Sequence, residues 1–244
     1  MCRLMGYVAL KDVTISGIAG PNFAEFTALS AKHGDGWGYA SLDGDKKAIT
    51  LDTARAKESE KFSRTTTSAE STGALLHLRW ATLNLDISEG NTHPFSFEDF
   101  AFIHNGSINP PQSLDAFIDK DLFKEFRGDT DSERYFYVVI SYIRKFGLHE
   151  GVRQAVHTIS EHCSYSSINA MLMTPEYFLT ISEHNNEKIP ADEKEGYYDL
   201  FYRRDDEGLL VASSGWNQEG WKQIPNHHIF EVNRATFESS LTKI

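Results

Sequence analysis

Cysteine, positive charge and long apolar runs are all scarce in this chain. Only two of its 244 residues are cysteine, and a disulfide between Cys2 and Cys163 would be unusual in a reducing compartment. No apolar run is long enough to cross a bilayer, and no charged-then-apolar leader stands before a cleavage site. We therefore expect a cytoplasmic protein.

Basic residues are outnumbered by acidic ones. The chain has 24 lysine and arginine residues against 35 aspartate and glutamate residues, a formal net charge of −11. This balance argues against a phosphate backbone or an anionic membrane as the partner, so we expect no nucleic acid and no membrane partner. The hydrophobic content of 40% is enough for one large core, which predicts a single domain over residues 1–244.

Cys2 directly follows the initiator Met1. If Met1 is removed, one residue carries both a thiol and a free α-amine, whose unperturbed pKa is about 7.7–8.0. Such a residue can supply a nucleophile and a base without a histidine partner. On its own, however, a cysteine at this position is usually only a small side chain at the start of a strand.

Other motifs accompany Cys2 in a recognisable order. They are GDGWG at 34–38, HLRWAT at 77–82, NTHP at 91–94, HNGS at 104–107 and GDTDSE at 128–133. With these motifs the chain resembles the class II glutamine amidotransferases, which are N-terminal nucleophile hydrolases. It looks most like the short stand-alone members, which are related to enzymes that cleave γ-glutamyl compounds. Segments 211–214 and 221–225 also fit this resemblance.

Hydrophobic periodicity changes twice along the chain, from strands to helices and back to strands. Such an order suggests layered sheets covered by helices, and the resemblance implies an α+β fold, the four-layer αββα sandwich of the N-terminal nucleophile hydrolases. A charged segment at 183–195 reads as a solvated loop. We expect strands at 3–10, 37–42, 47–51, 74–79, 100–104, 168–173, 177–181, 198–202, 209–212 and 228–232, and helices at 23–33 (capped by Asn22), within 59–72, and at 114–126, 132–146 and 152–160.

Asn105 and Gly106 are the candidate oxyanion hole. Attack on an amide carbonyl creates an oxyanion that needs hydrogen-bond donors, and the resemblance implies the Asn105 side-chain amide and the Gly106 N–H. The same dipeptide after an alternating run is also the common type I′ hairpin signal. A tight turn would itself expose the Gly106 N–H, so both interpretations are kept.

Four further residues are candidates for substrate binding. A guanidinium fork matches a carboxylate, so Arg79 is the candidate for the substrate α-carboxylate, unless it is an ordinary surface ion pair. The resemblance implies that Asp131 receives the α-amine, although helix capping is an equal alternative for an acidic residue there. Trp80 and Thr82 match pocket-lining positions of the family, with ordinary packing as the alternative.

Neither a metal nor a cofactor is expected. His77, His93 and His104 are not spaced as zinc ligands, and each lies in a motif of the resembling family. Two departures from the synthase-linked relatives, His33 before the glycine motif and Leu83-Asn84 after the threonine, favour the stand-alone group. They put glutamine itself in doubt as the physiological substrate.

These observations predict an amidohydrolase that cleaves the γ-glutamyl amide of glutamine or of a γ-glutamyl compound through a thioester on Cys2. One alternative is a glutaminase subunit that delivers ammonia to a separate synthase. Another is a non-catalytic γ-glutamyl-binding regulatory module, which a retained Met1 would favour. A small-molecule γ-glutamyl substrate is the expected partner, and a synthase partner or a homo-oligomer stays open.

Overall fold

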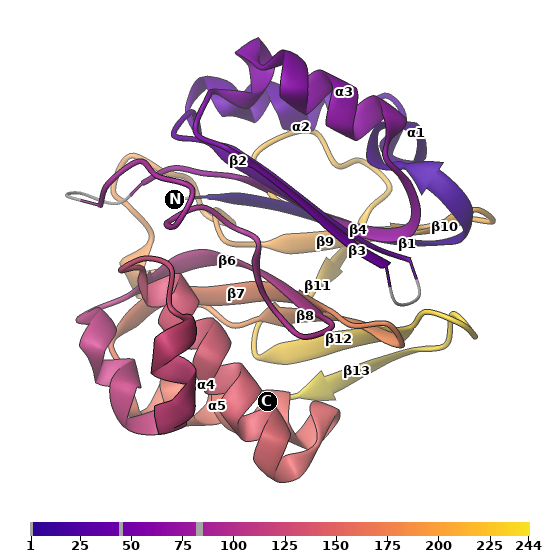
Figure 1. Ribbon diagram of the computed structural model, residues 1–244. Coiled ribbons are helices and arrows are strands. Elements are labelled where there is room, and N and C mark those ends of the chain that lie inside the picture. Colours follow the sequence, from indigo (N-terminus) through magenta and orange to yellow (C-terminus); the bar gives the residue numbers. More distant parts are fainter. Residues whose placement is uncertain (1, 44–45, 82–84) are drawn as a thin grey trace.

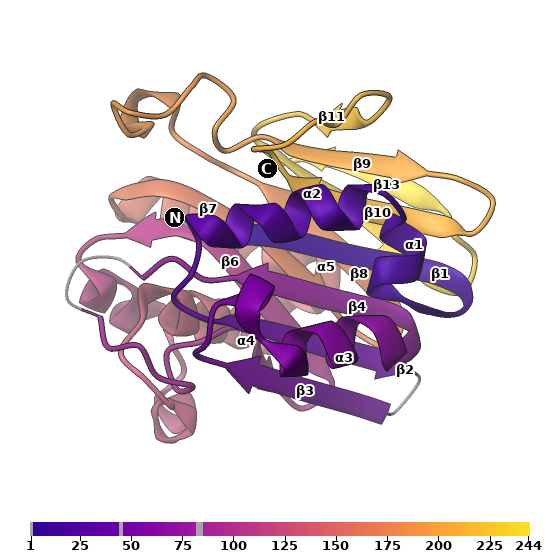
Figure 2. The same cartoon turned by 90° about the horizontal axis from the view of Figure 1, so that it is seen from above.

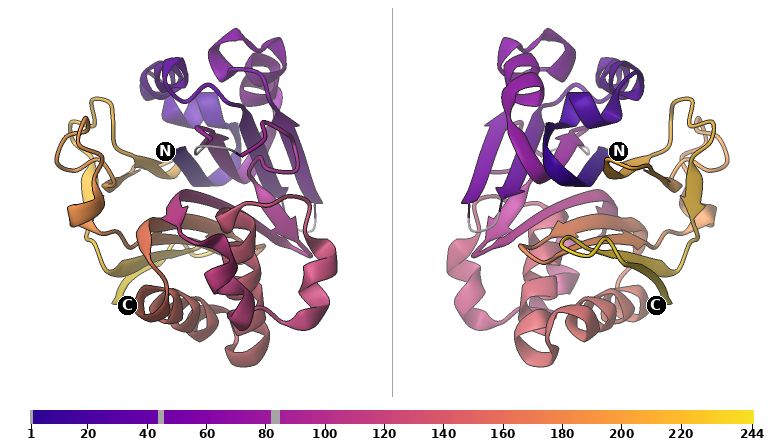
Figure 3. Two further views of the ribbon diagram at one scale, coloured as in Figure 1. Left: turned by 90° about the vertical axis from the view of Figure 1, so that its left-hand side faces the viewer. Right: turned by 90° about the vertical axis from the view of Figure 1, so that its right-hand side faces the viewer.

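Four layers make up the protein in the computed structural model, which describes residues 2–43, 46–81 and 85–244. Two β-sheets lie face to face, with helices on each outer face (Figure 1). The order is helices, sheet, sheet, helices, seen end-on in Figure 3. The expected α+β sandwich is therefore confirmed.

The first sheet has seven antiparallel strands in the order β11-β9-β10-β1-β4-β2-β3. Its central strand β1 comes from the apolar run that follows Cys2, and it pairs with β4 and β10 on its two sides. The strands are β1 (Arg3–Thr14), β2 (Trp37–Asp43), β3 (Lys46–Asp52), β4 (Glu70–Leu78), β9 (Leu200–Arg204), β10 (Gly208–Ser213) and β11 (Lys222–Ile224).

The second sheet has six antiparallel strands in the order β13-β12-β8-β7-β6-β5. Strand β5 covers the outer edge of β6 only from Phe100 to Phe102, so the later half of β6 has an edge without a strand partner among the described residues. The strands are β5 (Phe95–Phe97), β6 (Phe100–Ile108), β7 (Tyr165–Met173), β8 (Tyr177–Ser182), β12 (His228–Asn233) and β13 (Ser239–Lys243).

Helices cover the outer face of each sheet. Figure 2 shows helices α1, α2 and α3 lying across the first sheet. Helices α4 and α5 cover the second sheet (Figure 1). The α-helices are α1 (Ile15–Ala19), α2 (Asn22–Ala28), α3 (Glu60–Ser68), α4 (Asp131–Phe146) and α5 (Leu148–His162), and the 3₁₀ turns are η1 (Leu29–Ala31), η2 (Ala56–Glu58), η3 (Pro111–Phe117), η4 (Lys120–Glu125) and η5 (Asn186–Lys188).

Three apolar clusters hold the layers together. One packs α1 to α3 on the first sheet, one fills the space between the sheets, and one packs α4 and α5 on the second sheet. The sheets come very close at Gly6, where an added Cβ would lie 2.9 Å from the Phe178 ring and 3.0 Å from Leu75. Alternation along each strand divides its side chains between two of these clusters.

Most predicted elements are present, with three differences. The stretch 114–126 forms the 3₁₀ turns η3 and η4 rather than an α-helix, because apolar residues three apart suit either geometry. Asn22 is the first residue of α2 and not its cap, since Pro21 occupies that position without a side-chain bond. Strands β5, β11 and β13 and helix α1 were not expected from the sequence.

None of the helices in the described residues is both long and apolar enough to span a membrane.

Candidate active site

Cys2 lies immediately before β1, at the end of the space between the two sheets (Figure 1). It is partly exposed, and its thiol donates a hydrogen bond to the Trp80 carbonyl over 3.7 Å. The β1–β4 register pairs Arg3 with Leu78, which brings Cys2 beside Arg79. Burial raises the pKa of the Cys2 thiol, while the Arg79 guanidinium opposes this rise and the Asp131 carboxylate adds to it. The thiol is therefore protonated at pH 7 unless a base takes its proton.

The chain after β4 is held by the turn of the glycine motif. Asp35 accepts a hydrogen bond from the Ala81 N–H through its carboxylate over 2.8 Å, and its own N–H donates to the Arg79 carbonyl over 3.0 Å. The buried Arg79 guanidinium donates to the Asp35 carbonyl over 3.3 Å and to the Asp86 carbonyl over 3.1 Å. Arg79 is therefore no surface ion pair. Its guanidinium ties two segments together behind Cys2.

Asn105 and Gly106 lie within β6, paired with Asn169 and Ile168 of β7. The hairpin interpretation of this dipeptide is therefore wrong, and no turn exposes the Gly106 N–H. The local type I′ signal is overridden by pairing with a strand some sixty residues later in the chain. Glycine is still required here, because a Cβ on Gly106 would lie 1.7 Å from the Ser167 carbonyl oxygen.

The side chain of Asn105 faces the first sheet. Side chains alternate along a strand, and Ile103 lies in the cluster between the sheets whereas the His104 ring donates to or accepts from Ser132 of α4 on the other face. Asn105 is fully buried, and neither its amide nitrogen nor its amide oxygen has a hydrogen-bond partner among the described residues. Unpaired buried polar groups are uncommon and call for an explanation.

The Gly106 N–H faces the edge of β6 that β5 leaves uncovered. Ile168, opposite Gly106, donates its own N–H to the Glu183 carbonyl on the far side of β7. The two residues therefore form a non-hydrogen-bonded pair, and the polar groups of Gly106 point away from β7. Two residues earlier, the His104 carbonyl points the same way and contacts the His77 ring over 3.2 Å. This edge thus faces β4, next to β1.

Asp131 is the first residue of α4, but it does not cap the helix. Thr130 is the N-cap, and its hydroxyl accepts from the Glu133 N–H over 3.0 Å. The Asp131 carboxylate instead accepts from the Ile108 N–H at the end of β6 over 2.7 Å. It is 9% exposed. Asp131 is therefore not the N-cap, although it stands in the first turn, where a negative charge favours the helix. Its carboxylate is held at the end of β6.

Three buried histidines lie between these elements. The rings of His77 and His93 stack with their centroids 4.0 Å apart, and His104 lies 6.5 Å from His93. Burial lowers the pKa of His77 to about 3 and moves that of His93 well below its ordinary value. Burial also lowers the pKa of His104. All three rings are therefore neutral at pH 7.

Mild acid should destabilise the protein through these rings. Below pH 6.5 the unfolded chain binds protons that the folded chain rejects, so the free energy of unfolding falls as the pH drops from 6.5 toward 3. At pH 5 His77 alone accounts for about 2 kcal/mol of lost unfolding free energy.

We expect His77→Gln, which keeps a donor for the His104 carbonyl, to reduce by that amount the fall in unfolding free energy between pH 7 and pH 5, measured by urea titration. His162→Gln, at an exposed histidine of α5, should leave it unchanged, and an equal loss in both variants would contradict this assignment.

A cavity of about 740 Å³ opens between Trp80 and the end of β6. Cys2, Arg79, Asn105 and Gly106 are not among its described lining residues. Trp80 and Asp131, both expected at the site, line it, and so do Ser107 and Ile108 at the end of β6. Thr82 was also expected here but lies outside the described residues. The sequence alone did not indicate that Tyr197 lines the same cavity.

Residues 1–182 match the family model of the class II glutamine amidotransferases. That match covers about three quarters of the chain. The chain belongs to this family. Members of the class II glutamine amidotransferase family are glutamine-hydrolysing enzymes with an N-terminal cysteine.

Among class II relatives, the glutamine–fructose-6-phosphate aminotransferases (isomerizing) of Francisella tularensis and Vibrio cholerae are each 30% identical to this chain over 135 residues. Each alignment covers 54% of this chain and 21% of the relative. The chain thus spans about a fifth of the length of these curated relatives.

Solved structures share the class II fold at low sequence identity. A glutamine aminotransferase class-II domain protein from Silicibacter pomeroyi superposes with a TM-score of 0.70 at 15% identity, over 100% of this chain and 99% of the other. The glutamine phosphoribosylpyrophosphate amidotransferase of B. subtilis gives a TM-score of 0.66 at 16% identity, over 99% of this chain and 49% of the other. The N-terminal nucleophile hydrolase sandwich is thus established for this amidotransferase domain.

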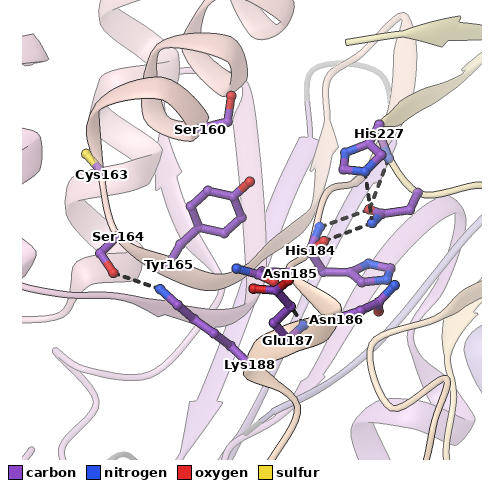
Figure 4. Close-up of a pocket in the computed structure, with 11 residues that line it drawn as sticks. Ser160, Cys163, Ser164, Tyr165, His184, Asn185, Asn186, Glu187, Lys188 and His227 are labelled. Atoms are coloured by element: carbon purple, nitrogen blue, oxygen red, sulfur yellow. Dashed lines mark hydrogen bonds between the residues drawn. The ribbon is translucent and has the colours of Figure 1, made fainter.

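A second hollow, of about 400 Å³, lies where the segment after β8 crosses the start of β7 (Figure 4). Cys163 lines it, but the residues expected at the amidotransferase site do not. The buried Glu183 carboxylate accepts from the Tyr165 hydroxyl over 2.7 Å and pairs with the His227 ring over 2.8 Å, and both of these partners line the hollow. Lys188 donates to Ser164 over 2.8 Å. Tyr165 is the first residue of β7 and Ser164 precedes it, so these contacts fasten the segment at the start of β7.

Proposed function

We propose that this protein is an N-terminal cysteine amidohydrolase that cleaves the γ-glutamyl amide of glutamine or of a γ-glutamyl compound. One observation carries the proposal. The buried amide of Asn105, without a partner among the described residues, faces the sheet whose central strand begins next to the Cys2 thiol. A buried donor without a partner, on the face that is turned toward this sheet, is a group that an oxyanion could use.

The chemistry begins with removal of Met1, which frees the α-amine of Cys2. This amine takes the thiol proton, which balances the raised pKa of the buried thiol. The thiolate attacks the γ-carbonyl carbon, and the Asn105 amide and the Gly106 N–H donate to the resulting oxyanion. The C–N bond then breaks, and the α-ammonium returns its proton to the departing amine. Water hydrolyses the thioester, which releases glutamate and restores the thiol.

Substrate recognition in this proposal rests on Arg79 and Asp131. The guanidinium would bind the α-carboxylate and the Asp131 carboxylate the α-amine, with Trp80 and Thr82 as parts of the wall. Both charged groups act on the Cys2 thiol electrostatically, which supports their closeness to it. The proposal includes one type 2 amidotransferase domain over residues 1–244, a cytoplasmic location and no cofactor.

A glutaminase subunit that passes ammonia to a separate synthase is the second candidate. The observation in its favour is that the aminotransferase relatives are about five times as long as the part aligned with this chain. In that case ammonia release would depend on a partner protein. The stand-alone hydrolase, in contrast, would release glutamate without one.

The test is an assay of glutamate release by the purified protein from glutamine and a panel of γ-glutamyl compounds. Intact mass spectrometry of the same sample identifies its N-terminus. We expect a chain that begins at Cys2 and releases glutamate from at least one γ-glutamyl compound. A fully active protein that retains Met1 would contradict the α-amine as base. A correctly processed protein that binds but does not cleave any compound would favour the regulatory module.

A further inference from the structure

The cavity lined by Trp80, whose carbonyl accepts from the Cys2 thiol, is larger than glutamine. At about 30 Å³ for each water-sized group, the roughly ten non-hydrogen atoms of glutamine would fill about 300 Å³, which is less than half of the 740 Å³ present. Part of the cavity is therefore available to a leaving group larger than ammonia. The nature of that leaving group is inferred on the basis of the proposed γ-glutamyl hydrolysis.

The wall that would face this leaving group lies outside the residues that match the family. The match ends at residue 182, and Pro190, Asp192, Glu193 and Tyr197 of the cavity wall all come from the next segment, residues 183–199. We call this segment the strap. Residues within the family match thus form one part of the wall, and the strap forms the rest.

The strap is fixed at several points. Its first part is held by the bond from Tyr165 of β7 to Glu183 and by the bond from Lys188 to Ser164. Figure 4 shows the second of these bonds. Near its other end, Arg3 donates to the Tyr197 carbonyl over 3.3 Å and lies 4.5 Å from the centre of its ring. Glu193 pairs with Lys32, whose ammonium also lies 4.8 Å from the centre of the Trp80 ring. A wall with these contacts can select its ligand by charge.

All charged residues among those lining the described part of the cavity are acidic: Asp131, Asp192 and Glu193. Asp131 is reserved for the substrate's α-amine in the proposed function, and Lys32 already neutralises Glu193. Asp192 is exposed and forms no ion pair with a described residue. Its carboxylate is therefore the group left to meet a charge on the leaving amine.

We propose that the physiological substrates are γ-glutamyl amides of diamines or polyamines, whose distal ammonium faces Asp192 of the strap. Cleavage breaks the bond between the γ-carbonyl and the near nitrogen, and water supplies the elements that complete glutamate and the free amine. The distal ammonium keeps its proton throughout. A leaving group that ends in a carboxylate meets repulsion from the same wall.

Three probes of equal length separate this proposal from simple size selection. They are the γ-glutamyl amides of putrescine, pentylamine and δ-aminovaleric acid, which end in a cation, a methyl group and an anion. Because an exposed ion pair contributes up to about a five-fold effect, we expect kcat/KM to fall by roughly three- to five-fold at each step of that series. Added salt should compress the differences, since the strap carboxylate is exposed.

Asp192→Asn should remove the preference for the cationic probe over the neutral one. Glu187→Gln is the matched control, because it removes the same charge from the same strap at an exposed residue that lines the other hollow. It should leave the series unchanged. Arg79→Lys, in contrast, should lower kcat/KM for all three probes alike, because a lysine cannot make the two-pronged contact with the shared α-carboxylate.

The outcomes distinguish this proposal from the one on which it rests. If the protein hydrolyses all three probes equally well, or prefers the anionic one, the leaving-group assignment is overturned while γ-glutamyl hydrolysis stands. If Glu187→Gln changes the series as much as Asp192→Asn, the effect belongs to overall charge and the assignment to Asp192 fails. If neither glutamine nor any probe yields glutamate, both proposals fall.

Discussion

Replacing Cys2 with alanine should lower kcat for glutamate release by roughly 10⁶-fold, the scale seen when a catalytic nucleophile is removed. Alanine leaves the α-amine in place but has no atom that can form the thioester. The fold should survive, because Cys2 precedes β1 and the substitution removes just the weak hydrogen bond from its thiol to the Trp80 carbonyl. The measurement is glutamate release on a γ-glutamyl compound that the wild type hydrolyses, with circular dichroism to check the fold.

Cys163→Ala is the matched control. Cys163 is the other cysteine, partly buried at the end of α5, with its thiol directed at the Ser113 carbonyl. Its loss should leave kcat unchanged. A glutamine-like electrophile should likewise add one covalent group to Cys2. Labelling at Cys163, or a Cys2→Ala protein with normal turnover, would show that the nucleophile is misassigned.

Asn105→Ala should lower kcat by roughly 10²–10³-fold, the usual cost of losing one oxyanion donor. KM should change little, because the donor acts on charge that develops in the transition state. The substitution should not lower the melting temperature, because the buried amide has no hydrogen bond to lose among the described residues. An activity loss without a stability loss is the result to look for.

Asn169→Ala provides the contrast, on the strand residue directly opposite Asn105. Its amide accepts from the Glu183 N–H over 2.8 Å and donates to the Tyr198 carbonyl over 2.6 Å. Truncation should therefore lower the melting temperature by several degrees, because buried groups at both ends of the strap lose their partner. If Asn105→Ala kept near-normal kcat, or behaved like Asn169→Ala, Asn105 would be a structural residue.

Local patterns were enough to predict the elements next to Cys2. An apolar run directly after Cys2 predicts a strand, and β1 begins at Arg3. The stretch 74–79 likewise reads as a strand, and β4 ends just before Arg79. These predictions succeeded because both strands are buried on two faces and consist mainly of apolar, β-prone residues.

Non-local contacts decided the rest. The Asn105-Gly106 dipeptide has the chemistry of a turn, and only its pairing with β7 keeps it in a strand. The charges at 183–195 predict a solvated loop, and nothing local indicates that Asp192 lies at a cavity next to Trp80. Asp35 was visible as part of a glycine motif, but its bond to the Ala81 N–H depends on how β2 and β4 meet.

The central place of β1 in its sheet has a consequence for motion. Strands at the edge of a sheet can open locally at low free energy, whereas a central strand cannot separate until its neighbours on both sides do. Strands β4 and β10 flank β1, so we expect Cys2, at the start of β1, to move with the part of the sheet that opens least easily. Fluctuations of the periphery would then alter how a ligand enters but not where the Cys2 thiol lies. A partly opened state that keeps this sheet would also keep that thiol in position.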